Sequence, residues 1–269
     1  MVNLQTVAPA TSPAPYLGGK RILSKTIIKL INGMPHDGYA EPFVGMGGVF
    51  LRRNLQPKTE VINDISGEVA NLFRILQRHY PQFMDHLRFQ VTSRREFERL
   101  RKCDPSTLTD LERASRFLYL QKLAFGGKVS GQHFGVQRTG PARFNLLKLA
   151  PQLEEIHERM AGVVIENLPW RTFIGRYDRP GMLFYLDPPY WGNETDYGRN
   201  VFGRADFAEM AGVLAGLKGR FILSLNAVQG VFETFQQFSI EEVDCTYSVA
   251  GNGVTNQVKE VIITGGATL

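Results

Sequence analysis

Two patterns of apolar residues alternate along the chain. Short runs of consecutive apolar residues, of which residues 182–186 are the clearest, are typical of strands buried on both faces. Between them lie longer segments in which apolar residues recur every three or four positions, as in residues 20–31, and this spacing predicts helices. Further strands are predicted at residues 60–63, 163–166, 221–225, 240–244 and 258–264, with another leading into Glu41, and further helices at residues 48–54, 68–78 and 205–217. The alternation predicts an α/β fold with a largely parallel sheet covered by helices.

The pattern changes between residues 80 and 147, where no run of the buried-strand type occurs. Charged segments with helical spacing come first, at residues 94–102 and 111–123. A glycine-rich stretch follows at residues 126–131, and we expect a hairpin from there to about Asn145. We interpret residues 80–147 as a mainly helical subdomain with a hairpin, inserted between residues 15–79 and 148–269 of the α/β domain. Residues 1–14 are rich in Ala, Pro, Thr and Ser, and we expect a flexible tail there.

Composition narrows the class of protein. The net charge of +5 suits a polyanionic partner, because each neutralised phosphate releases counterions, although many proteins of this charge bind no nucleic acid. The two cysteines lie far apart and the five histidines are scattered, so we expect neither a disulfide framework nor a metal site. The sequence has no apolar run long enough to cross a bilayer, and its first residues do not resemble a signal peptide. We expect a cytoplasmic protein, and a monomer or a weak dimer.

The sequence Asp187-Pro188-Pro189-Tyr190, directly after the clearest apolar run, carries the strongest chemical signal. Ligands of open α/β sheets bind beyond the carboxyl ends of the strands, and two prolines fix the backbone there and remove two N–H donors. The Asp187 carboxylate and the Pro188 carbonyl are then two acceptors for the exocyclic amine of a base. Holding both N–H groups favours a pyramidal nitrogen whose lone pair points at an electrophilic methyl group. Tyr190 offers a flat face on which the base can stack. The alternative is that these residues form only a rigid turn.

Three other segments suit a cofactor site. Residues 41–48 place several glycines at a strand-to-helix turn, where the backbone can approach a ligand closely, although such turns are common. Asp64 follows the next predicted strand, where a carboxylate can accept hydrogen bonds from ribose hydroxyls or, alternatively, cap a helix. Residues 15–20 look like a phosphate loop but lack its first glycine and its Ser or Thr. We therefore interpret Lys20 as the partner of a ligand carboxylate, with Tyr16 packed nearby.

The order of these segments resembles the Dam-like family of DNA adenine methyltransferases. The matching segments are Tyr-Leu-Gly-Gly-Lys at 16–20, Glu-Pro-Phe-Val-Gly-Met-Gly-Gly at 41–48, Asn-Asp-Ile at 63–65 and Asp-Pro-Pro-Tyr at 187–190. Residues 256–263 are similar to the family's final strand, so the resemblance covers nearly the whole chain. It is the order of the family's alpha group, in which the target-recognition segment lies between the cofactor and catalytic motifs. The resemblance implies a Rossmann-like, S-adenosylmethionine-dependent methyltransferase that acts on the N6 amino group of adenine in duplex DNA.

The resemblance also implies roles for individual residues. Asp187, Pro188, Pro189 and Tyr190 would be catalytic, and the cofactor would be bound by Tyr16, Gly19, Lys20, Glu41, Phe43, Gly45, Gly47, Asp64, Ile65 and Asp187. The chain departs from the family in two places. Family members often have Trp where Tyr16 stands, and residues 120–127 match the GATC-specific members only loosely.

Reaching the amino nitrogen of a paired adenine requires the base to be flipped out of the duplex, at a cost of a few kcal/mol. We expect the glycine-rich stretch and hairpin to contact the DNA, because glycines permit close approach and Gln and Arg side chains can contact base edges. The residues that we expect to contact DNA are Lys122, Gly126, Gly127, Lys128, Gln132, Gln137 and Arg138. For the basic run at residues 94–102 we favour a solvated helix face, since Glu96 and Glu98 alternate with its cations.

Three other functions remain open at this stage. The same chemistry can act on the cytosine amino group or on adenine in RNA. The aspartate at position 187 favours adenine, because similar enzymes that methylate the cytosine amino group more often have Ser at this position. A nicotinamide dehydrogenase would use the glycine turn but has no use for Asp187-Pro188-Pro189-Tyr190. A catalytically silent DNA-binding protein would bind DNA without binding S-adenosylmethionine.

Overall fold

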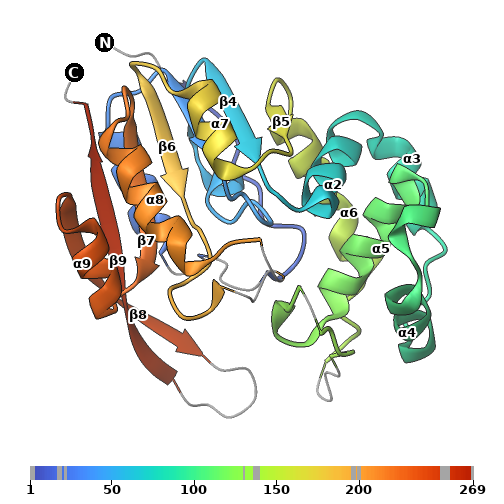
Figure 1. The fold of residues 1–269 in the computed structure, drawn as a ribbon. Coiled ribbons are helices and arrows are strands. Elements are labelled where there is room, and N and C mark those ends of the chain that lie inside the picture. The colour runs from blue at the N-terminus through green and yellow to red at the C-terminus, as the bar shows by residue number, and fades with distance from the viewer. Residues whose placement is uncertain are drawn as a thin grey trace.

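The computed structural model describes residues 4–16, 20, 23–129, 131–135, 140–194, 198, 201–248 and 255–267 (Figure 1). Its strands are β1 (Gln5–Thr6), β2 (Gly38–Glu41), β3 (Leu55–Gln56), β4 (Thr59–Asn63), β5 (Val164–Glu166), β6 (Met182–Leu186), β7 (Arg220–Asn226), β8 (Ser239–Ser248) and β9 (Thr255–Gly266). Its α-helices are α1 (Ser24–Gly33), α2 (Gly67–Arg78), α3 (Tyr80–Leu87), α4 (Arg94–Lys102), α5 (Asp110–Leu123), α6 (Leu146–Arg159), α7 (Trp170–Tyr177), α8 (Arg204–Ala215) and α9 (Gln229–Phe235). Short 3₁₀ turns lie at η1 (Phe50–Arg52), η2 (Pro105–Thr107) and η3 (Phe125–Gly127).

A seven-stranded sheet in the order β5-β4-β2-β6-β7-β9-β8 forms the centre of the molecule. The first five strands in this order are parallel, and β9 pairs antiparallel with both β7 and β8. The predicted α/β fold is confirmed, and so is each strand predicted from an apolar run. Chain order reverses between β2 and β6, which lie side by side. Such a switch point opens a crevice at the carboxyl ends of the strands.

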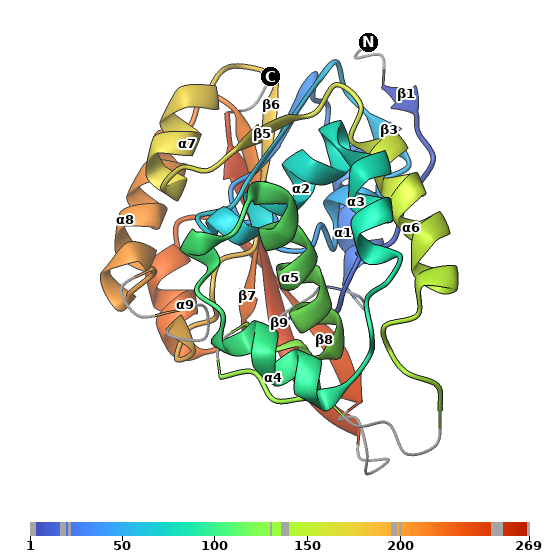
Figure 2. The same ribbon diagram turned by 90° about the vertical axis from the view of Figure 1, so that its right-hand side faces the viewer.

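Helices cover both faces of this sheet, because each buried strand sends alternate side chains to opposite sides. Tyr39 and Ile62 belong to one apolar core with α1, α2 and the helices of residues 80–159, whereas Ala40 and Val61 belong to a second core with α7, α8 and α9. Figure 2 shows α7, α8 and α9 to the left of the sheet and α1, α3 and α6 to its right. The arrangement is the three-layer fold expected of a Rossmann-like protein.

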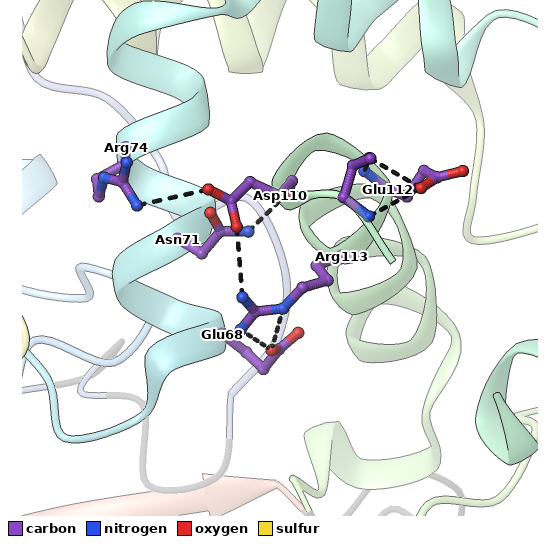
Figure 3. A network of polar contacts seen from close by, with 7 residues as sticks. Glu68, Asn71, Arg74, Asp110, Glu112 and Arg113 are labelled. Carbon is purple, nitrogen blue, oxygen red and sulfur yellow. Dashed lines mark hydrogen bonds and ion pairs between the residues drawn. The ribbon is translucent and has the colours of Figure 1, made fainter. Parts of the chain in front are cut away.

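The helices of residues 80–147 are docked on the sheet domain through α2. Figure 3 shows Arg113 of α5 donating from Nε to Glu68 Oε1 of α2 over 3.0 Å. Asn71 Nδ2 donates to the Asp110 carbonyl over 2.7 Å, and Arg74 Nη1 lies 3.8 Å from Asp110 Oδ2 (Figure 3). Beneath these contacts the apolar side chains of both parts form one continuous core. Helices α3, α4 and α5 are therefore packed with the sheet domain around one core.

Side-chain caps fix where the predicted helices of this region begin. Ser93 accepts a hydrogen bond from Glu96 N at the start of α4, and Thr109 and Glu112 form a capping box at the start of α5. Along α4, Arg99 pairs with Glu96 and Arg101 pairs with Glu98. This pairing is what the solvated-face interpretation of residues 94–102 predicts.

Three local expectations are wrong. The expected flexible tail is instead packed from residue 4 onward: β1 pairs with β3, Ala10 N donates to the Leu51 carbonyl over 2.8 Å, and Ala10 is buried. Small side chains such as Ala10 allow this close contact. The predicted helix at residues 48–54 shortens to η1.

The predicted hairpin to Asn145 also differs. In the described part of this stretch only one antiparallel bridge forms, between Ala124 and Phe134. Gly126 and Gly127 have φ of +69° and +68°, and left-handed backbone of this kind interrupts strand pairing. Residues 130 and 136–139 lie outside the described part of the chain. Among the described residues, no helix has both the length and the apolar character needed to span a bilayer.

Candidate active site

A cavity of about 1680 Å³ opens at the switch point between β2 and β6. The loops that follow β2, β4 and β6 line it, together with the N-terminal segment and two residues of the helical region, Lys122 and Val129. Most of the cofactor residues predicted from the sequence meet in its wall: Tyr16, Lys20, Glu41, Phe43, Gly45, Asp64, Ile65 and Asp187. Gly47 lies just behind the wall, and Gly19 lies outside the described residues.

Asp187 follows the last residue of β6 and is anchored through one of its two carboxylate oxygens. Lys20 Nζ lies 2.9 Å from Oδ1, and Ser224 Oγ of β7 donates to the same oxygen over 3.2 Å. Ser224 in turn lies 3.0 Å from the Tyr185 hydroxyl. Oδ2 has no donor among the described residues, and the side chain is 20% exposed to the cavity mouth. One oxygen is thus held by the protein, and the other keeps its lone pairs for a ligand.

Lys20 is buried among three partners rather than held open for a ligand. Its ammonium lies 3.2 Å from Glu260 Oε2 of β9, in addition to Asp187, and it donates to the Tyr190 hydroxyl. Its Nζ also stands 4.2 Å from the centroid of the Tyr190 ring. The sequence suggested a ligand carboxylate as its partner, whereas the structure pairs it with two protein carboxylates. Glu260, which is fully buried, was not predicted as a site residue.

The carboxyl groups of the crevice have raised pKa values. Burial raises the pKa of Asp187 from 3.8 to about 6, the Lys20 ammonium opposes this shift, and the charge on Glu260 adds to it. Burial likewise raises the pKa of Glu41 to about 8, although the Tyr39 hydroxyl, donating over 2.6 Å, lowers it in part. Asp187 is therefore the stronger acid of the two, and it is mostly ionised at pH 8.

The loop after Asp187 is fastened to β7 by one amide side chain. Asn226 Oδ1 accepts from Trp191 N, and Asn226 Nδ2 donates to the Trp191 carbonyl, both over 3.0 Å. Pro188 and Pro189 are buried, and the Trp191 ring packs on Phe207 with centroids 4.9 Å apart. The four predicted catalytic residues thus sit in a loop that is fixed at both ends.

The glycine turn after β2 allows a close approach between segments. Gly45 has φ of +49°, and a Cβ at this position would lie 3.0 Å from the ring of Tyr16. Gly47 has φ of +69°, and a Cβ there would lie 2.7 Å from Leu51 Cγ. The contact at Gly47 is closer than real Cβ atoms show, the contact at Gly45 would push the Tyr16 ring by a few tenths of an ångström, and both φ values suit glycine. The predicted need for glycine in this turn therefore has a steric reason.

Asp64 follows β4 and accepts two backbone hydrogen bonds. Gly45 N donates to Oδ2 and Ser66 N donates to Oδ1, each over 2.9 Å. Burial raises the pKa of Asp64 to about 6, and these two donors hold the pKa below what burial alone would give. The carboxylate joins the glycine turn to the start of α2. Each oxygen retains a second lone pair for a ligand hydroxyl.

Apolar and aromatic side chains line the cavity beyond Asp64. Phe43 meets Phe202 edge to face, with centroids 6.0 Å apart, and Ile65 is 44% exposed. Trp170 Nε1 donates to Asp206 Oδ1 over 3.1 Å, which closes the far side. Asn63, which was not predicted as a site residue, donates to the carbonyls of Pro42 and Leu168 and so joins the end of β4 to the loops after β2 and β5. A flat ring of a ligand would meet apolar surface here.

The residues predicted to contact DNA separate into two groups. Gly126 and Lys128 are exposed, whereas Gln132 is buried and donates to Gln121 Oε1 and to the Lys128 carbonyl. Two more of the residues predicted to contact DNA also contact the protein interior. Lys122 donates to the Pro13 carbonyl over 3.0 Å, and Gly127 is buried. Gln137 and Arg138 lie outside the described residues. Among the described residues, no cluster of His, Cys, Asp and Glu is suited to a metal ion.

Comparisons with known proteins identify a family for this chain. Residues 16–249 match the family described as D12 class N6 adenine-specific DNA methyltransferase. The chain is 24% identical to a type II methyltransferase, M1.LlaDCHI, of Lactococcus lactis subsp. cremoris, over 93% of each chain. It is also 24% identical to a DNA adenine methylase of Haemophilus influenzae, over 98% of this chain and 97% of that one. A type II methyltransferase of Paramecium bursaria Chlorella virus NC1A, M.CviBI, is 22% identical over 78% of this chain and 80% of its own length.

Proposed function

The chain belongs to the D12 class of N6 adenine-specific DNA methyltransferases, and we propose that its methyl donor is S-adenosylmethionine and that its target adenine is flipped out of duplex DNA into the cavity beside Asp187. The observation that carries this proposal is the carboxylate of Asp187. Its Oδ1 is anchored by Lys20 and Ser224, while its Oδ2 keeps its lone pairs at the mouth of the cavity.

The residues of the cavity fit a nucleoside-containing donor. Asp64 would accept hydrogen bonds from the ribose hydroxyls, and Phe43 and Ile65 would contact the adenine ring of the donor. The glycine turn at Gly45 and Gly47 would bring backbone close to the donor. When bound, S-adenosylmethionine supplies an electrophilic methyl group on a sulfonium. The methyltransferase family implies a donor of this type, and the cavity walls supply the polar and apolar groups that it requires.

Asp187 and Pro188 would hold the amino group of the target base. Asp187 Oδ2 and the Pro188 carbonyl accept its two N–H bonds, which withdraws the nitrogen lone pair from the ring and directs it towards the donor. The neutral amine is far too weak an acid for a carboxylate of pKa about 6 to deprotonate. The proton is lost after transfer, when the nitrogen carries a positive charge. The Tyr190 ring, fixed by Lys20, provides the stacking face, worth about 1–3 kcal/mol for a base.

The size of the cavity supports the flipping of the base. Pockets for a single small molecule measure roughly 300–1,000 Å³, and this cavity, at about 1680 Å³, has room for a second ligand beside the donor. The net charge of +5 favours binding to the phosphates of the duplex. Both features are consistent with an extruded adenine entering from the side of the DNA-contacting loops.

Methyl transfer to duplex DNA, followed by identification of the modified base by mass spectrometry, tests the proposal. We expect N6-methyladenine in DNA, and no methylated cytosine or RNA. Asp187→Ala should abolish transfer and leave DNA binding largely intact, because the lost group contacts only the target amine and buried neighbours. Asp85→Ala, which changes an exposed aspartate of α3, is the matched control and should be fully active. Full activity of Asp187→Ala would overturn the assignment.

A further inference from the structure

The N-terminal segment crosses from the helical region to the cavity. Residues 9–12 and 14–16 line the cavity wall, and side chains of α5 and α6 hold the backbone of this segment from the other side. Gln152 Nε2 donates to the Ser12 carbonyl over 2.6 Å, and Lys122 Nζ donates to the Pro13 carbonyl. The N-terminal segment thus forms this part of the cavity wall, and side chains of α5 and α6 support it.

Gln121 makes the innermost of these contacts. Its side chain is fully buried, and its Nε2 donates to the Pro15 carbonyl over 2.8 Å and to the Gly127 carbonyl over 2.7 Å. Its Oε1 accepts from Gln132 Nε2 over 3.1 Å, and Gln132 also donates to the Lys128 carbonyl. One amide therefore bridges the N-terminal segment and the glycine-rich loop. A buried amide with all of these partners fixes its neighbours in one geometry.

Steric contacts extend this bridge to the cavity. A Cβ at Gly127 would lie 3.1 Å from Pro15 C and from Tyr16 N, so the glycine-rich loop lies directly against the backbone before Tyr16. The ring of Tyr16 in turn lies against Gly45, whose backbone N–H donates to Asp64. A continuous chain of contacts therefore runs from the glycine-rich loop, through Tyr16, to the carboxylate that we assign to the ribose.

We propose that Gln121 is a positioning residue that fixes the Pro15–Tyr16 wall of the donor site to the DNA-contacting loop, so that DNA and donor each strengthen the binding of the other. This inference rests on the proposed function, because it takes residues 126–129 and 131–132 as the DNA-contacting loop and the cavity as the donor site. Gln132 then acts inside the protein, orienting Gln121, and not on base edges. Coupling of this kind is reciprocal: the factor by which DNA raises donor affinity equals the factor by which donor raises DNA affinity.

Gln121→Met tests the inference, because methionine keeps the length of the side chain and removes both donors. The matched control is Gln77→Met on α2, which also removes two side-chain donors to backbone carbonyls, those of Met160 and Val163, but away from the cavity. Titration calorimetry would measure the affinity for S-adenosylhomocysteine, with and without a short duplex carrying the site that the wild-type protein methylates. In the wild type we expect the duplex to raise this affinity at least about 5-fold, a typical coupling.

In Gln121→Met, which loses three buried hydrogen bonds, we expect the coupling factor to fall to about one and the KM for the donor to rise by about tenfold or more. The kcat at saturating donor should change much less, and Gln77→Met should behave as the wild type. If Gln121→Met does not fold, Gln132→Met should show a smaller loss of coupling, because it removes the donor to Gln121 Oε1 and to the Lys128 carbonyl but leaves both hydrogen bonds that Gln121 Nε2 donates.

Unchanged coupling in a folded Gln121→Met protein, or no coupling in the wild type, would overturn the inference. Failure of the proposed function gives a different result, since the wild type would then not bind S-adenosylhomocysteine at all. The inference alone is contradicted if the wild type binds S-adenosylhomocysteine and Asp187→Ala loses methyl transfer, while Gln121→Met keeps the coupling between DNA and donor.

Discussion

Replacing Asp187 by asparagine should make the protein more stable while lowering its activity. Among the residues that the structure describes, the buried cluster contains one cation, Lys20, and two carboxylates, Asp187 and Glu260. In Asp187→Asn the ammonium keeps Glu260 at 3.2 Å, and the amide oxygen can still accept from Lys20 and Ser224. The substitution therefore leaves one balanced ion pair in place of an excess negative charge. An excess charge in a buried cluster is costly because water no longer solvates it.

The raised pKa of Asp187 sets the size of the effect. The pKa rises from 3.8 to about 6 on folding, and each unit corresponds to about 1.4 kcal/mol, so ionised Asp187 costs up to about 3 kcal/mol at pH 8. Because the folded pKa is the higher one, the stability linked to protonation is complete below pH 4 and is lost as the pH rises through 6. The advantage of the asparagine variant should thus be largest above pH 7 and shrink as the pH falls.

Urea denaturation of the wild type and of Asp187→Asn, at pH 8 and at pH 5, measures this difference. At pH 8 the variant should gain up to about 3 kcal/mol, or about 6 °C in Tm for a chain of this size. Asp85→Asn, at an exposed pair with Arg88, should change stability by less than about 0.5 kcal/mol at either pH. A variant less stable than the wild type at pH 8 would refute the reasoning, because the pairing of Asp187 with Lys20 would then outweigh the cost of burial.

Three further predictions concern activity. Tyr190→Ala should lower transfer by about 10-fold or more through lost stacking, whereas Tyr190→Phe should be mild; equal losses in steady-state assays would assign the role to the hydroxyl. Glu260→Gln should move the acidic limb of the kcat–pH profile below 6, because the charge on Glu260 raises the pKa of Asp187, and an unmoved limb would contradict this electrostatic coupling. Gly45→Ala should raise the KM for the donor with little change in DNA affinity, since its Cβ meets the ring of Tyr16 at 3.0 Å; an unchanged KM would show that the wall can shift.

Much of the fold was predictable because its strands are short apolar runs in regular alternation with helices. The run at residues 182–186 matches β6, and the charged helix at residues 94–102 matches α4. Helices α3, α6, α7 and α9 were not predicted, and two of them contain a proline, Pro81 in the first turn of α3 and Pro151 inside α6. Proline disfavours a helix interior, so local sequence preferences do not predict a helix in such segments. Tertiary packing determines whether the helix forms.

The sequence predicted some residues of the site and not others. Asp187 and Asp64 follow strands whose carboxyl ends meet at one edge, so their proximity follows from the fold class. Glu260 was not identified as a site residue, because nothing local distinguishes a glutamate within a closing strand. Its pairing with Lys20 depends on β9 being inserted beside β7, an arrangement that local sequence patterns do not specify.

The ion pair between Lys20 and Glu260 also has a consequence for how the enzyme is made. The two residues are 240 positions apart, and β9, which carries Glu260, lies between β7 and β8. A growing polypeptide on the ribosome cannot assemble this centre until β9 has emerged, even when the first strands have already folded. Contacts between such distant parts of a chain form slowly, because a long loop must close first. We therefore expect chains whose translation stops before β9 not to methylate DNA.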